Sequence, residues 1–209
     1  DVYKRQMYSK ERAQQITKND VRFIPAGIHE NVQLKSARLA ESPTGNKFLE
    51  IVFEKDGATL TQTEWKPTKF EGMDEAALQK KEDTQFSRMM QILLCFYKDE
   101  QLIFNGSTFE EFATEVVSYL NNADKSKLVR VKIVYNNKGY TTLPSYAKYT
   151  FIEPMILPDG MTSAIAKLGI DNFEKPIVAD VETPVDTLDS VIKNETTSFN
   201  TGNLNDLPF

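Results

Sequence analysis

The stretch KFLEIVFEKDGATLTQTEWK, residues 47–66, decides the fold of this chain. Residues 47–54 alternate between polar and apolar side chains, which is the period of a strand with one buried face. The tripeptide KDG at 55–57 is typical of a tight hairpin turn. Residues 59–66 form the returning strand, and Pro67 ends it. The sequence therefore predicts an antiparallel hairpin with these residues on its buried face: Leu49, Ile51 and Phe53.

A curved strand is predicted before this hairpin. Residues 31–42 (NVQLKSARLAES) start with apolar side chains at every second position and then change phase between Leu34 and Ala37. Such a phase change indicates a β-bulge, which helps a strand to curve around a small barrel. The turn signal PTGN at 43–46 then leads into the hairpin.

Two more strands are predicted further along the chain. Residues 128–135 (LVRVKIVY) alternate cleanly, which places Arg130 and Lys132 on the outward face. Residues 140–152 (YTTLPSYAKYTFI) follow a turn and form a last long strand, interrupted at Pro144.

The middle of the chain has a helical period instead. Apolar residues recur at helical spacing over 74–98, and Ser107 followed by Glu110 fits the capping box of a second helix. Three strands, a helical block at about 70–120 and two further strands are the order of an OB-fold barrel. We therefore expect a mainly β fold with a helical insert (α+β): a five-stranded, OB-fold-like barrel with the helical block between strands 3 and 4.

Both ends of the chain are expected to lie outside this barrel. Residues 1–6 (DVYKRQ) read like the translation of a sequencing-adapter end, so Met7 is the expected start; a natural basic N-terminus is the alternative. The barrel domain is expected over residues 7–170. Residues 171–209 lack periodicity and are rich in polar and acidic residues, which indicates a disordered acidic tail.

The net charge of −5 conceals an asymmetry. The strand-rich blocks 1–69 and 121–170 carry +3 and +4, whereas residues 70–120 and 171–209 each carry −6. A net-acidic protein can still bind phosphate when its basic groups share one face. The alternative is that these groups are scattered over a solvated surface.

The composition leaves little for catalysis. The chain has one histidine and one cysteine, Cys95, and it lacks a Gly-rich phosphate loop, a paired-His metal motif and a nucleophile elbow. No apolar run is long enough to span a bilayer. We therefore expect no enzyme activity, no catalytic residue, no metal, no cofactor and no membrane partner.

The end of the sequence carries the sharpest motif. Residues 203–209 (NLNDLPF) resemble the tail of bacterial single-stranded-DNA-binding proteins, in which acids precede an aliphatic residue, Pro and Phe. The resemblance implies a partner-binding tip formed by Asp206, Leu207, Pro208 and Phe209. Only Asp206 is acidic, whereas the family usually has several consecutive acids, so a weaker contact or a different partner is expected. The alternative is a chance ending.

The body carries a second resemblance. The segments FIPAGIHENV at 23–32 and TEWKP at 63–67 are similar to single-stranded-DNA-binding proteins of tailed phages, over about residues 20–155. This implies a protein that protects single-stranded DNA without sequence preference during replication, recombination or repair. It would act in the cytoplasm of an infected bacterium and recruit replication or recombination proteins. The alternatives are a recombination mediator that anneals strands and a phage interaction or structural module that binds no DNA.

Aromatic residues interleaved with basic ones give the candidate binding face. Proteins of this kind stack bases on exposed rings and follow phosphates with Lys and Arg. A shared face requires Trp65, Phe48 and Arg130 on one wall of the barrel, and core packing is the alternative for any single ring. The expected DNA-binding residues are Trp65, Phe48, Tyr146, Lys35, Arg38, Lys47, Lys66, Lys69, Arg130, Lys132, Lys138 and Lys148.

Overall fold

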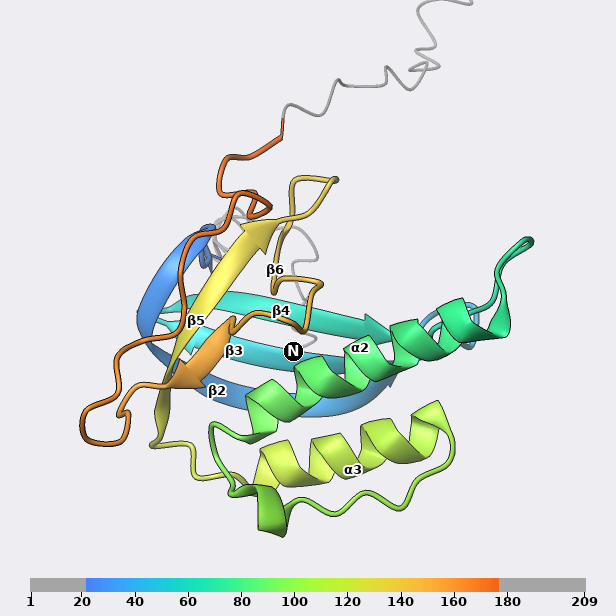
Figure 1. Ribbon diagram of the computed structural model, residues 1–209, viewed down its shortest axis with the longest axis horizontal. Coiled ribbons are helices and arrows are strands. Elements are labelled where there is room, and N and C mark those ends of the chain that lie inside the picture. Colours follow the sequence, from blue (N-terminus) through green and yellow to red (C-terminus); the bar gives the residue numbers. More distant parts are fainter. Residues whose placement is uncertain (1–21, 177–209) are drawn as a thin grey trace, which may run out of the picture. The chain divides into compact units, whose positions relative to one another are not determined.

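The computed structural model describes residues 22–176 (Figure 1). Within these residues the fold is mainly β, with a nearly closed, barrel-like sheet and two α-helices. The sheet has seven strands, several of them very short, where five were expected. In chain order the elements are β1 (Arg22–Phe23), β2 (Gly27–Glu41), β3 (Lys47–Lys55), β4 (Ala58–Trp65), α2 (Glu75–Leu93), the 3-10 turn η1 (Asp99–Gln101), α3 (Phe109–Asn122), β5 (Leu128–Tyr135), β6 (Thr141–Thr142) and β7 (Ile152–Pro154).

The predicted hairpin is confirmed as β3 and β4. Its strands pair from Phe48 opposite Trp65 down to Lys55 opposite Ala58. Asp56 and Gly57 link them with φ angles of 50° and 78°. A two-residue turn with both φ values positive matches the right-handed twist of the strands that it joins. The predicted apolar face is fully buried: Leu49, Ile51 and Phe53.

The long strand β2 gives the sheet its curvature. One part of it pairs with β3 and another part with β5, and the ladder order is β1-β4-β3-β2-β5-β6. The register with β3 shifts between Leu34 and Ser36, so the predicted bulge is confirmed. A second shift, between His29 and Val32, interrupts the pairing with β5. Because a bulge bends its strand and increases the twist, β2 can belong to two walls of the barrel.

The last strand is shorter than predicted. Only β6 and β7 pair with β5, and the chain between them leaves the sheet near Pro144. Proline cannot donate to a ladder, and the Pro144 carbonyl instead accepts a hydrogen bond of 2.8 Å from Arg88 Nε. No backbone ladder joins β6 to β4 in the described part of the chain.

The side chain of Gln62 joins β4 to β6 where no backbone ladder does. We call this junction of β4 and β6 the seam. Gln62 of β4 accepts hydrogen bonds from Thr142 Oγ1 at 2.8 Å and from the Leu143 backbone N–H at 2.9 Å. Its amide nitrogen donates to Glu64 Oε1 at 2.8 Å. The side chain of Gln62 therefore connects the two margins of the sheet.

The helical block packs against the barrel from one side (Figure 1). α3 contacts β2 and β3, and α2 contacts α3 and β7. The capping box of α3 uses Thr108 and Glu111, one residue later than predicted, because Thr108 is the residue whose side chain accepts from the N3 amide. No helix within residues 22–176 is long and apolar enough to cross a membrane.

The compact unit extends beyond the predicted boundary at residue 170. The segment after β7, drawn in orange in Figure 1, runs beside β5. The Tyr135 amide donates to the Asn172 carbonyl at 2.8 Å. The predicted start of the tail at Asp171 is therefore wrong, since Asp171 and Asn172 pack against the barrel.

Candidate nucleic-acid interface

The outer face of the hairpin carries two aromatic rings, an exposed one at Trp65 and a partly exposed one at Phe48. Phe48 and Trp65 lie directly opposite each other on β3 and β4, and their ring centroids are 4.4 Å apart with the planes tilted by 31°. Alternation places both rings away from the core, and Trp65 is 46% exposed. The prediction that Trp65 lies on the exposed face is confirmed.

Two lysines flank this pair. Lys47 precedes Phe48, and Lys66 follows Trp65, so antiparallel pairing brings both to the same end of the hairpin. Both are exposed, and neither forms an ion pair with another residue of the described range 22–176. We call Lys47, Phe48, Trp65 and Lys66 the aromatic wall. It combines the two kinds of group that single-strand binders use.

Three further predicted cations are exposed but already paired. Each has a carboxylate within hydrogen-bond distance, and exposed pairs of this kind contribute little to stability. The pairs are Lys35–Glu54 (2.9 Å), Arg38–Glu50 (2.5 Å) and Lys69–Glu75 (2.8 Å).

Arg130 does not join the aromatic wall. It lies on β5, on the other side of β2 from β3 and β4. Its guanidinium contacts Glu153 at 2.5 Å and Glu30 at 3.1 Å, and its side chain is only 15% exposed. The expectation that Trp65, Phe48 and Arg130 share a wall is therefore wrong. The physical reason is that β2 separates the two groups of strands.

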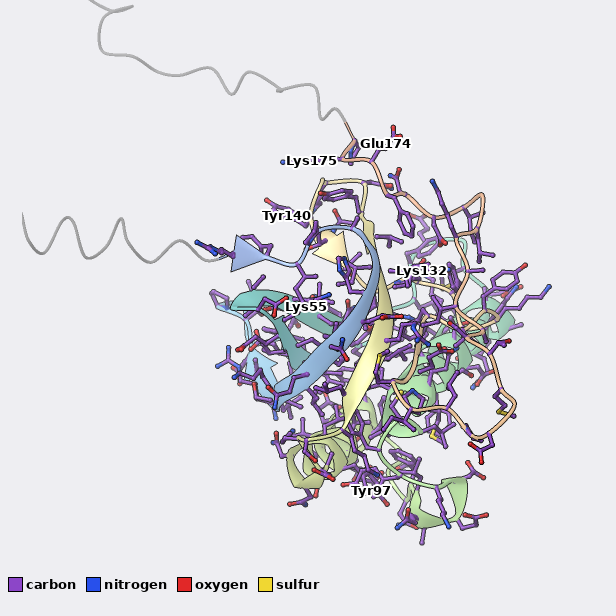
Figure 2. All side chains as sticks on the ribbon, turned by 90° about the vertical axis from the view of Figure 1, so that its left-hand side faces the viewer. Lys55, Tyr97, Lys132, Tyr140, Glu174 and Lys175 are labelled. Atoms are coloured by element: carbon purple, nitrogen blue, oxygen red, sulfur yellow. The ribbon has the colours of Figure 1, made fainter. Side chains whose placement is uncertain are left out.

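Lys132 is on the predicted face of β5 but is fully buried, so the prediction that it is available to a phosphate on the outside is wrong. Its ammonium donates to Asp171 Oδ2 and to Tyr146 Oη, each at 2.8 Å, and neither side chain of the ion pair has exposed surface. Figure 2 places Lys132 among the side chains beside β5, whereas Lys175 projects from the edge. The outward face of β5 is covered by the segment after β7, so Lys132 has no surface to offer a phosphate.

The remaining predicted DNA-binding residues differ in their exposure to solvent. Tyr146 is half-buried against the core, and its hydroxyl donates to Asp171 Oδ1 at 2.7 Å, so its ring is a packing group. Burial, followed by the Asp171 carboxylate, raises the pKa of Tyr146 above its ordinary value. Lys138 and Lys148 are exposed, and Lys148 lies over the Tyr149 ring at 5.6 Å.

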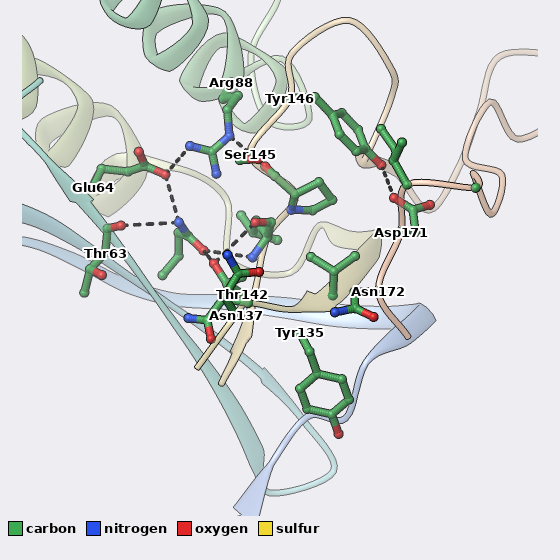
Figure 3. A pocket seen from close by; sticks show the side chains of 17 residues that line it. Thr63, Glu64, Arg88, Tyr135, Asn137, Thr142, Ser145, Tyr146, Asp171 and Asn172 are labelled. Atoms are coloured by element: carbon green, nitrogen blue, oxygen red, sulfur yellow. Dashed lines mark hydrogen bonds and ion pairs between the residues drawn. The ribbon is translucent and has the colours of Figure 1, made fainter. Parts of the chain in front are cut away.

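A hollow at the seam between β4 and β6 was not predicted from the sequence. It has a volume of about 700 Å³, and Figure 3 shows Thr63, Asn137 and Ser145 among the side chains that line it. Glu64 and Arg88 form a buried ion pair of 2.6 Å on its inner side. The signal for it was present in the sequence, because Gln62 and Glu64 are polar residues in phase with the buried Leu60.

The charge of the described part is close to neutral. Residues 22–176 contain 19 Lys/Arg and 21 Asp/Glu, which gives a net charge of −2. The same part contains no group of three or more His, Cys, Asp or Glu side chains placed to hold a metal ion. Cys95 is buried, and its burial, followed by the charge of Glu153, raises the pKa of the thiol, which makes it a poor nucleophile.

The predicted partner-binding tip, Asp206 to Phe209, lies outside the described residues, as does the segment 1–6. Comparisons of the chain with protein-family models, with curated proteins and with solved structures find no match.

Proposed function

We propose that this chain binds single-stranded DNA without sequence preference, through the aromatic wall. The observation that carries the proposal is the contacting pair of Trp65, which is exposed, and Phe48, which is partly exposed beside it. Each base has a π-face, so exposed rings can hold a strand of any sequence. Lys47 and Lys66 supply positive charge beside the rings, where the phosphates of a stacked strand would pass.

The order of the strands supports an OB-type barrel. A long, bulged strand shared by two walls, then a hairpin, a helical block and a strand that returns to the first are the expected features of that architecture. In this proposal β6 and β7 are the two paired ends of an interrupted fifth strand, and β1 is an addition. OB-folds bind oligonucleotides on the face of their second and third strands, which correspond to β3 and β4.

The cellular role rests on the two resemblances in the sequence. The protein would coat single-stranded DNA during phage replication, recombination or repair in the bacterial cytoplasm, and it would not act as an enzyme. The tip at 206–209 would recruit a replication or recombination protein. Deletion of residues 203–209 should then leave DNA affinity unchanged or slightly higher, and abolish capture of that partner in a pull-down.

A second candidate function is a protein-interaction module that binds no DNA. The specific observation in its favour is that five of the nine predicted DNA-binding cations already have carboxylate partners, Lys35, Arg38, Lys69, Arg130 and Lys132. A recombination mediator would instead bind single strands and also accelerate the annealing of complementary strands, which an annealing assay measures directly.

The deciding experiment is fluorescence anisotropy with labelled oligo-dT and with duplex DNA at several salt concentrations. We expect tighter binding to the single strand, with a log–log salt slope that steepens by about 0.7 for each phosphate neutralised. Trp65 is the only tryptophan in the chain, so its intrinsic fluorescence should be quenched as oligo-dT binds. A preference for duplex, or binding that ignores salt, would contradict the proposal.

A further inference from the structure

A second hollow lies beside α2, next to the hollow at the seam. The second has a volume of about 490 Å³ and lies along the part of α2 that includes Lys80 and Lys81. The two hollows share three of their lining residues, Glu64, Arg88 and Ser145. The two hollows therefore adjoin, and we call them together the seam groove.

The floor that the two hollows share carries no free charge. Arg88 Nη1 contacts Glu64 Oε1 at 2.6 Å, and Arg88 Nε donates to the Pro144 carbonyl at 2.8 Å. Gln85 Nε2 donates to the other oxygen of Glu64 at 3.2 Å. Because this ion pair is buried and hydrogen-bonded on both sides, it neither attracts nor repels a phosphate strongly.

The two ends of the groove differ in chemistry. At the seam, Thr63, Asn137 and Ser145 are exposed, and their side chains make no hydrogen bond to any other residue in the described range. At the helix, Lys80 and Lys81 are exposed, and neither has an ion pair within residues 22–176. Neutral donors and acceptors suit the edge of a base, whereas ammonium groups suit a phosphate.

We propose that the seam groove is a second nucleotide-contact site, in which the seam end holds a base and the N-terminal half of α2 holds a phosphate. This inference rests on the proposed function and extends it. Thr63 is two residues before Trp65 on the same outer face of β4, so a strand stacked on the aromatic wall can continue directly into the groove. The helical block is then part of the DNA interface as well as a cover for the core.

The test compares two variants that should both weaken oligo-dT binding but differ in their effect on the salt slope. Lys80→Glu should weaken oligo-dT binding and lower the salt slope by about 0.7, since one phosphate contact is lost. Asn137→Ala should weaken binding by about two- to tenfold with the salt slope unchanged, since it removes neutral hydrogen bonds. Its effect should also disappear on an oligonucleotide with an abasic backbone, because no base then enters the groove.

Lys98→Glu is the matched control, because it makes the same charge change beyond the other end of α2 and should leave affinity and slope nearly unchanged. Thermal melts of each variant exclude unfolding as the cause. If wild type binds and Trp65→Ala weakens it while Lys80→Glu and Asn137→Ala both match Lys98→Glu, the inference fails and the proposed function stands. If wild type does not bind single strands at all, both fail.

Discussion

The Lys132 ammonium and the Asp171 carboxylate are 2.8 Å apart, and neither side chain has any surface exposed to solvent. The Leu168 amide and the Tyr146 hydroxyl complete the hydrogen bonding of the carboxylate, at 2.7 Å each. This pair fastens the segment after β7 over β5. A buried ion pair is fragile in one respect, because removal of one partner leaves the other as an uncompensated charge.

Asp171→Asn should therefore destabilise the fold strongly. The substitution keeps the size of the side chain but leaves the Lys132 ammonium buried without a counter-charge, which typically costs about 3–5 kcal/mol. Urea denaturation followed by circular dichroism measures the loss. Glu54→Gln is the control, because it breaks the exposed pair with Lys35 and should cost about 0–1 kcal/mol. Equal losses from both variants would mean that Lys132 is neutral or solvated in the folded chain.

Stability should also fall in acid. Burial favours the neutral form of Asp171, but the hydrogen bonds from Lys132, Leu168 and Tyr146 outweigh burial and lower its pKa. Burial likewise favours the neutral form of Glu153, but hydrogen bonds from Ser163, Arg130 and Ala164 outweigh it and lower the pKa of Glu153. A carboxyl with a lower pKa in the folded state stabilises the fold above its unfolded pKa, about 4.

That contribution should be lost as the pH falls below about 4 and through the lower folded values. The measurement is the free energy of unfolding from urea titrations at several pH values between 7 and 2.5. Asp171→Asn should be less stable at neutral pH and should lose less stability in acid than wild type. Parallel curves for the two proteins would show that Asp171 does not contribute to the acid response.

The seam offers a separate test through Gln62. Gln62→Leu keeps a similar volume, but it leaves the Leu143 amide and the Thr142 hydroxyl without their acceptor. A buried polar group without a partner costs about 1–3 kcal/mol. We expect a loss of that size and faster hydrogen exchange at Leu143. Thr61→Val, at an exposed position on the same strand, should change stability by no more than about 0.5 kcal/mol.

How far the sequence could predict this structure depends on the range of the interactions. The β3–β4 hairpin and the bulge in β2 follow from local alternation and a turn signal, and both were predicted correctly. Alternation also placed Arg130 and Lys132 correctly on the face opposite the core valines of β5. It cannot say whether that face meets solvent, because alternation only assigns residues to faces.

The covering segment could not have been predicted in the same way. Lys132 and Asp171 are 39 residues apart in sequence, and the chain that leads to Asp171 has no periodic pattern. The contacts at the seam also join residues that are far apart in sequence. Gln62 and Glu64 are polar residues on a buried strand face. Their hydrogen-bond partners, Thr142, Leu143 and Arg88, lie in distant parts of the chain, so local sequence does not indicate them. The aromatic wall was predictable because both of its rings lie on one local hairpin.

The aromatic wall makes the sharpest functional prediction, because Phe48 and Trp65 contact each other and, under the proposed function, would both contact a bound base. Trp65→Ala and Phe48→Ala should each weaken oligo-dT binding by about 1–3 kcal/mol. The double variant should lose less than the sum of the two, since either ring alone depends on the other for its position. Both rings lie on the outer face of β3 and β4, so the fold should survive each substitution.

The measurement is anisotropy of labelled oligo-dT with the wild type, the two single variants and the double variant at one salt concentration. Phe23→Ala is the matched control: Phe23 is 64% exposed, but β1 pairs with β4 at Thr59, six residues and about 20 Å along the strand from Trp65. Unchanged affinity in Trp65→Ala with an intact fold would place any DNA elsewhere. Losses that add fully would mean that the rings contact separate bases, so that their 4.4 Å stacking in the free chain is not retained on DNA.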